Sequence, residues 1–207
     1  MVAHSLSMLQ FKVDLNPKDL HILIWFGYIL RYSTKMLKLV RWIPPICDFG
    51  LNVDGACKDN PGECGGGECL RDSQGNVHMA FSHFYGVGTN MIAELRALCD
   101  GLRLATSLGY KLSIIHSDSQ ILVNSICEKK LLSWLSYRWW REVVSFIRES
   151  ALMSHVYRET NQQADALANF AVKDKYNKVF RGAHNLSYSC KGPMTIDKIG
   201  LLNVRLL

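Results

Sequence analysis

The stretch LNVDGACKDNPG, residues 51–62, decides how the rest of the chain is interpreted. Leu51 and Val53 alternate with Asn52 and Asp54, which is the period of a strand with one buried face. Aspartate is depleted in strands, and the glycine directly after Asp54 ends the regular pattern. Asp54 is therefore either part of a turn or a carboxylate that a strand presents to a partner. One aspartate does not separate these two interpretations, so the rest of the chain has to supply the partners.

Composition sets the class of protein. The chain has 207 residues, of which 48% are hydrophobic, and this predicts one packed domain with extensions rather than a disordered chain. The longest apolar run, residues 20–30, is shorter than the roughly 20 residues that a membrane span needs. We therefore expect no membrane association. The N-terminus lacks the layout of a secretion signal, and the seven cysteines form no CxxC motif. These features predict an intracellular protein that is not secreted, in nucleus or cytoplasm.

Charge divides the chain into three parts. Residues 1–48 carry a net +3, residues 49–172 a net −2 and residues 173–207 a net +5. A Trp-Ile-Pro-Pro stretch at 42–45 is typical of a linker, because paired prolines stop regular structure. We expect an N-terminal extension and linker over 1–48, a folded domain over 49–172 and a basic C-terminal tail over 173–207. Basic flanks suit contact with phosphates, and they are equally common on solvated tails.

Hydrophobic periodicity predicts the secondary structure of the middle part. Three strands in a meander come first, separated by loops and turns rich in Gly, Pro, Asn and Ser. A helical period follows over 89–108, and strands and helices then alternate. The predicted order is βββαβααβα, an α/β fold in which helices cover a mixed sheet. The expected strands are 49–54, 68–72, 76–86, 111–118 and 154–159, and the expected helices are 89–108, 119–130, 133–150 and 162–176.

Three further acids fall at the ends of these predicted elements. Glu94 lies near the start of the first helix, Asp118 ends the fourth strand, and Asp165 lies just inside the last helix, which Asn161 is expected to cap. Each acid alone has a structural explanation, since carboxylates favour helix N-termini and aspartates cap helices. Four carboxylates at one edge of a sheet would repel one another, and divalent cations relieve that repulsion. Oxygen ligands suit Mg²⁺ or Mn²⁺, and two such ions about 3.5–4 Å apart support phosphodiester hydrolysis.

The sequence resembles the type 1 ribonuclease H domain, and more closely the plant reverse-transcriptase-like ribonuclease H family of retroelement-derived reading frames. Four blocks carry the resemblance in the family's order: LNVDGACKDNPGECGGG with RDSQG, then IAELRAL, HSDSQ and YRETNQQADALA. The resemblance implies a ribonuclease H-like fold with a five-stranded mixed sheet. It also implies endonucleolytic hydrolysis of the RNA strand of an RNA–DNA hybrid with two Mg²⁺ ions, for which Mn²⁺ is a possible substitute.

The resemblance assigns roles to individual residues. Asp54, Glu94, Asp118 and Asp165 match the four catalytic, metal-binding acids. Asn60 and the backbone near Cys57 match the segment that touches ribose 2′-hydroxyls, which are the groups that distinguish RNA from DNA. Asn90, Ser119 and Gln120 match positions near the substrate backbone. The expected partner is therefore nucleic acid, bound by a monomer.

One departure leaves the function open between two alternatives. Many bacterial-type members carry a histidine in a flexible loop before the last aspartate, whereas here Arg158-Glu159-Thr160 joins strand to helix directly. His155 lies within the predicted strand and is no substitute. The first alternative is an active hybrid ribonuclease. The second is a domesticated nucleic-acid-binding module of the same fold with little or no cleavage. A zinc site at Cys64, Cys69, His78 and His83 is disfavoured by the spacing.

Overall fold

The computed structural model describes residues 16–27, 37–147 and 151–206. It divides into two compact units, Lys38–Arg205 and a second unit of Met1–Leu37 with Leu206–Leu207. The described part of the second unit contains helix α2 (Pro17–Trp25), whose N-terminus is capped by the side chain of Asn16. The fold and the candidate site belong to the unit Lys38–Arg205.

A mixed sheet is the centre of this unit. Its strand order is β6-β5-β2-β3-β4-β7. Strands β2, β3, β4 and β7 are antiparallel neighbours, whereas β2, β5 and β6 run parallel. The strands are β2 (Phe49–Cys57), β3 (Gly62–Arg71), β4 (Val77–Gly88), β5 (Leu112–Ser117), β6 (Leu152–His155) and β7 (Lys178–Arg181).

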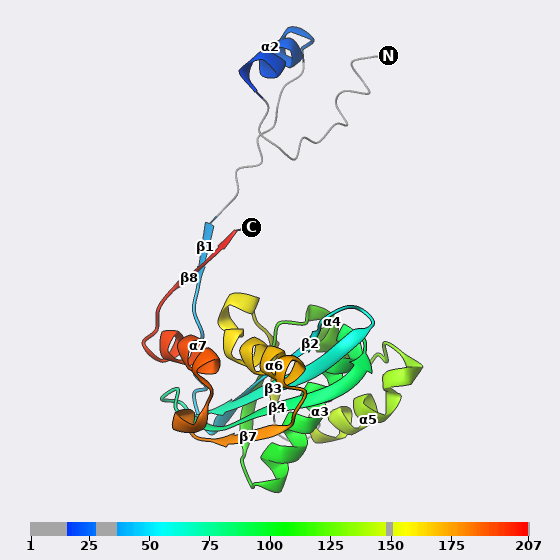
Figure 1. Ribbon diagram of the computed structural model, residues 1–207, viewed down its shortest axis with the longest axis vertical. Helices are drawn as coiled ribbons and strands as arrows, with labels where there is room; N and C mark the ends of the chain where they lie inside the picture. The colour runs from blue at the N-terminus through cyan, green and yellow to red at the C-terminus, as the bar shows by residue number, and fades with distance from the viewer. Residues whose placement is uncertain (1–15, 28–36, 148–150, 207) are drawn as a thin grey trace. The chain divides into compact units, whose positions relative to one another are not determined.

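Helices cover both faces of the sheet (Figure 1). Leu51, Val53, Leu70 and Phe81 pack against one group of helices. Alternate residues of the same strands, such as Cys69 and Ala80, pack on the opposite side. The first group comprises α3 (Asn90–Ser107), α4 (Gln120–Cys127) and α5 (Tyr137–Ile147). The second group comprises α6 (Gln162–Asp174) and α7 (Tyr188–Lys198). Short 3₁₀ helices at Trp134–Ser136, Arg158–Thr160 and Ala183–Asn185 lie in the connections between these elements.

The predicted element order βββαβααβα and the α/β class are confirmed, with one correction to the sheet. Six strands are present rather than five, because β7 adds to β4 after the last predicted helix. Strand β7 has only four residues and lies in a basic segment, so its alternation of apolar and polar residues is too short to be recognised in the sequence. The strand predicted over 154–159 lies at 152–155, and residues 158–160 form a 3₁₀ turn instead. Of the helix predicted over 133–150, residues 148–150 lie outside the described residues.

Strand β3 begins six residues before the predicted start, and its glycines explain the difference. The GGG run at 65–67 reads as a loop in the sequence, but it lies within the sheet. A Cβ atom on Gly67 would lie 2.2 Å from the carbonyl oxygen of Ala164, and one on Gly65 would lie 2.7 Å from the side chain of Ala171. The glycines therefore let α6 approach the sheet closely, which a side chain would prevent.

The C-terminal segment contributes to the packed unit. Phe180, Leu186 and Cys190 are buried on the α6 side of the sheet. Asp197 of α7 accepts a hydrogen bond of 2.6 Å from the buried guanidinium of Arg71, and this guanidinium lies 3.7 Å from the ring centre of the buried Trp42. Residues outside 49–172 thus pack on the predicted domain. The last strand, β8 (Asn203–Leu206), pairs with β1 (Leu37–Val40) in a separate two-stranded ribbon.

Two of the seven cysteines are bonded to each other. Cys57 and Cys64 lie opposite each other on β2 and β3 and form a disulfide. Cys47, Cys69, Cys99, Cys127 and Cys190 are free. The disulfide closes the loop that carries Asn60. Among the described residues, no helix is both long and apolar enough to cross a membrane.

We predict that Asp197→Ala destabilises the protein by about 3–5 kcal/mol, because it leaves the buried Arg71 charge without its partner. Asp174→Ala removes an exposed pair with Lys178 and should cost no more than about 0.5 kcal/mol. Urea unfolding of the two variants provides the comparison. Equal, small effects would mean that the Arg71–Asp197 pair does not hold α7 on the domain.

A second prediction concerns Glu68, which is fully buried on β3. Its Oε1 accepts a long hydrogen bond of 3.4 Å from Tyr85, and its Oε2 has no partner. Burial, followed by the charge of Asp100, raises the pKa of Glu68 well above its ordinary value. The folded state therefore retains a proton that the unfolded state releases above about pH 4.3. This contribution to stability is present below that pH and is lost as the pH rises.

Glu68→Gln should consequently be more stable than the unaltered protein at pH 8, and its advantage should shrink at pH 5. Chemical unfolding at the two pH values measures this difference. Glu128→Gln, at an exposed position, is the matched control and should change stability equally little at both. An advantage of Glu68→Gln that does not depend on pH would show that the buried carboxyl is not the cause.

Candidate active site

The site begins where β2 brings Asp54 next to the start of α3. Leu51 and Val53 are fully buried, so the alternation predicted from the sequence places Asp54 on the opposite face. Gly55 follows, and a Cβ atom there would lie 2.2 Å from the backbone nitrogen of Glu94. The missing side chain lets the first turns of α3 touch the strand. Glu94 therefore lies beside Asp54.

Asp118 joins this pair through the parallel pairing of β2 with β5. Val53 of β2 is the neighbour of Ser117, the last residue of β5, so the next residues along the two strands, Asp54 and Asp118, lie side by side. Carboxylate oxygens of Asp54, Glu94 and Asp118 all lie within 4.8 Å of one another. In the part of the chain that the structure describes, this is the group of acids with the geometry to hold a metal ion.

The pKa values of Asp54 and Glu94 reflect this crowding. Burial, then the charges of Asp118 and Asp165, raises the pKa of Asp54 well above its ordinary value. Burial, then the charges of Asp54 and Asp118, raises the pKa of Glu94 in the same way. Without a cation, the cluster therefore resists carrying its full negative charge. A bound divalent ion would reverse that preference.

Asp165 lies close to the cluster but has a different partner. It sits in the first turn of α6, and its carboxylate accepts a hydrogen bond of 2.7 Å from the guanidinium of Arg158. Its charge still raises the pKa of Asp54. The structure thus brings three of the four predicted acids within ligand distance of one another, and it places the fourth next to them in an ion pair.

Two residues of the site were not predicted to take part in it. Arg158 appeared in the sequence only as part of a short loop. Asn161 appeared only as a helix cap, and its side chain caps nothing. Instead its amide donates to the carbonyl oxygen of Val53 at 2.9 Å and to Asp118 at 3.3 Å, and its oxygen accepts from Asn52 at 2.9 Å. The NQQAD run that contains Asn161 was the signal available.

Asn52 connects this network to the C-terminal helix. Its side-chain oxygen accepts a hydrogen bond of 2.8 Å from Arg71, which in turn binds Asp197 of α7. An unbroken chain of side-chain hydrogen bonds therefore runs from α7 through the sheet to Asp118. Buried polar side chains that are hydrogen-bonded to one another hold the strands and helices that carry them in a single relative arrangement.

The predicted nucleic-acid contacts lie at the end of β2, in the β2–β3 loop and at the starts of α3 and α4, close in sequence to the acids. Asn60 accepts a hydrogen bond of 3.2 Å from the backbone N–H of Asn90, so these two predicted contacts are neighbours. Cys57 lies at the end of β2 in the disulfide. Ser119 caps α4 through a bond of 3.4 Å from the backbone N–H of Leu122, and Gln120 donates to Asn124 at 2.7 Å. Their contact with nucleic acid stays a prediction.

The residues at this edge fit a divalent cation. Three carboxylates converge, and Oε2 of Glu94 is buried without a hydrogen-bond partner. An unpartnered buried carboxylate oxygen is costly unless a cation satisfies it. Carboxylate oxygens are the ligands that Mg²⁺ and Mn²⁺ prefer. The fold and this site together define a class of protein, an α/β domain with a carboxylate centre for divalent metal at one edge of its sheet.

Comparison with known proteins identifies the family within that class. Residues 52–171 match the family described as reverse transcriptase-like, and the chain belongs to this family. A putative ribonuclease H protein of Arabidopsis thaliana is 32% identical over 66% of this chain and 23% of its own length. A ribonuclease H of Chlorobium phaeobacteroides is 30% identical over 60% of this chain and 94% of its own length.

A solved structure agrees with these matches. The RNase H1 of the halophilic archaeon Halobacterium salinarum superimposes with a TM-score of 0.55 at 29% identity, covering 61% of this chain and 98% of that one. The chain thus spans about a quarter of the Arabidopsis relative, 94% of the Chlorobium protein and 98% of the crystallised Halobacterium chain. The predicted ribonuclease H-like fold is confirmed.

We predict that Asp54→Asn weakens Mn²⁺ binding by at least about tenfold, since loss of an outer-shell partner alone typically costs 10–100-fold. Without metal, the same variant should melt at a higher temperature, because the repulsion among the three carboxylates is reduced. Calorimetric titration and thermal melts in a chelator measure the two effects. Asp174→Asn, remote from the cluster, should change neither. Absence of Mn²⁺ binding by the intact protein at millimolar concentration would contradict the metal centre.

Proposed function

We propose that the chain is a metal-dependent endonuclease that hydrolyses the RNA strand of RNA–DNA hybrids. The observation that carries this proposal is the convergence of Asp54, Glu94 and Asp118 within 4.8 Å at the edge of a ribonuclease H-like sheet. The names of its relatives, which are ribonucleases H, support the same reaction class.

In this proposal the four acids Asp54, Glu94, Asp118 and Asp165 are catalytic residues that hold two Mg²⁺ ions, with Mn²⁺ as a substitute. Such ions, when bound, provide an activated water and neutralise charge on the scissile phosphate. The chain's own residues orient them. Asn161 holds Asp118 through its amide, and Arg158 holds Asp165. A metal ion held by Asp165 would compete with Arg158 for that carboxylate.

Specificity for RNA is assigned to the loop between β2 and β3. The Cys57–Cys64 disulfide and the bond between Asn60 and the Asn90 backbone hold this loop next to the start of α3. Asn60 and the backbone near Cys57 are proposed to contact ribose 2′-hydroxyls, which are absent from DNA. Asn90, Ser119 and Gln120 are proposed to contact the substrate backbone. That the protein acts as a monomer inside the cell is also a prediction.

The experiment is cleavage of labelled duplexes by the purified full chain. We expect Mg²⁺-dependent cuts within the RNA strand of a hybrid and none in a DNA duplex of the same sequence. Asp118→Asn is expected to lower kcat by about 10²-fold or more, whereas Asp174→Asn should leave it unchanged.

Two results would overturn the proposal. Equal cutting of the DNA duplex would indicate a nuclease without RNA specificity. Hybrid binding with no cleavage under either metal would indicate the alternative function, a nucleic-acid-binding module of the same fold.

A further inference from the structure

The β1–β8 ribbon contacts the loop that leads into the candidate active site. This loop, residues 156–161, joins β6 to α6. The Lys38 ammonium of β1 donates a hydrogen bond of 2.8 Å to the hydroxyl of Tyr157 and lies 4.6 Å from its ring centre. The guanidinium of Arg205, from β8, lies 4.5 Å from the same ring. Two cations, one from the first strand and one from the last strand of the chain, thus hold one aromatic side chain.

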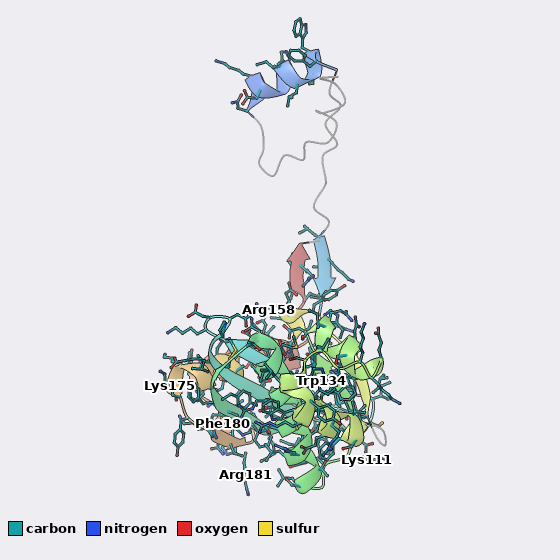
Figure 2. The ribbon with its side chains drawn as sticks, turned by 90° about the vertical axis from the view of Figure 1, so that its right-hand side faces the viewer. Lys111, Trp134, Arg158, Lys175, Phe180 and Arg181 are labelled. Atoms are coloured by element: carbon teal, nitrogen blue, oxygen red, sulfur yellow. A yellow bond between two sulfur atoms is a disulfide. The ribbon has the colours of Figure 1, made fainter. Side chains whose placement is uncertain are left out.

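Arg205 also holds a second residue of the same loop. Its guanidinium pairs with the carboxylate of Glu159 at 2.9 and 3.3 Å. Residues 157 and 159 are therefore both fixed by the ribbon, and Arg158 lies between them. The side chain of Arg158 points the other way, to Asp165. Figure 2 places Arg158 at the end of the domain where β1 and β8 lie.

The backbone of the loop transmits this fixation to the acids. The N–H of Thr160 donates to the carbonyl oxygen of Tyr157 at 2.8 Å, and that of Asn161 donates to the carbonyl oxygen of Arg158 at 3.0 Å. The loop is thus one tight turn that cannot shift at Tyr157 without moving Asn161. The side chain of Asn161 contacts Asp118, as described above.

We propose that Lys38 and Arg205 are positioning residues that hold the 156–161 loop, so that Arg158 and Asn161 face Asp165 and Asp118. Both lie outside residues 52–171, the part of the chain that matches the family. Direct contact with a phosphate explains the arrangement less well. Arg205 is already paired with Glu159, and Lys38 already donates to Tyr157.

The kinetic test rests on the proposed function and uses the full chain. Arg205→Met and Lys38→Met should lower kcat for hybrid cleavage about threefold to tenfold with little change in KM, the size expected for coupled neighbours. Arg205→Lys should recover part of the loss. When Arg158 is already replaced by alanine, Arg205→Met should add less than its full loss, because part of its effect acts through Arg158 and the rest through Asn161. Arg181→Met, an exposed arginine of β7 at the opposite end of the domain in Figure 2, is the matched control.

A second measurement does not need activity. Amide hydrogen exchange of residues 158–161 should become faster in Arg205→Met and Lys38→Met, and remain unchanged in Arg181→Met. Unchanged exchange in both ribbon variants would overturn the proposal. So would a raised KM with a weaker salt dependence, which would indicate phosphate contact, or losses that multiply with Arg158→Ala. If the intact protein does not cleave hybrids, the proposed function fails while the exchange experiment still tests the positioning role.

Discussion

Mutual repulsion among three crowded carboxylates, one buried and two half-buried, is the constraint on which the rest of the structure depends. Asp54 and Glu94 are held together because Gly55 lets α3 touch β2, and Asp118 is added by the parallel pairing with β5. Folding alone would avoid such an arrangement, since burial and neighbouring charge both raise the pKa values of Asp54 and Glu94. The other contacts at this edge of the sheet offset the repulsion among the carboxylates, and a bound divalent cation would neutralise their charge.

Compensation comes from cations and amides on elements that are distant in sequence. Arg158 neutralises Asp165, and its own pKa is raised by the bond with that carboxylate. Asn161 binds Asp118 and belongs to the hydrogen-bond chain through Asn52 and Arg71 to α7. The ribbon holds the same loop from outside. C-terminal elements α7 and β8 therefore both connect to the site, although the family match ends at residue 171. The basic C-terminal segment thus packs on the domain in addition to carrying positive charge.

The sequence predicted the parts of the fold and site that follow from local periodicity. Alternation over 51–54 placed Asp54 on its strand, and the helical period after Thr89 placed Glu94 in the first helix. Contacts between residues that are distant in the chain produce no periodic pattern in the sequence, so they were not predicted. Lys38 and Tyr157 are 119 residues apart, and Arg71 and Asp197 are 126 apart. Strand β7 was too short to detect, and the glycines of β3 were taken for a loop because their reason lies in the approach of α6. The sequence shows an arginine at position 158, but it does not show that this side chain binds Asp165.

The central claim is that Asp54, Glu94 and Asp118 form a divalent metal centre. Anomalous diffraction from crystals grown with Mn²⁺ tests it most directly, because it locates the ion without relying on activity. The account predicts an anomalous peak within coordination distance of oxygens from all three carboxylates, with Asp165 turned toward it and away from Arg158. Peaks only at other acids, or none at millimolar Mn²⁺ with the three side chains ordered, would contradict the account.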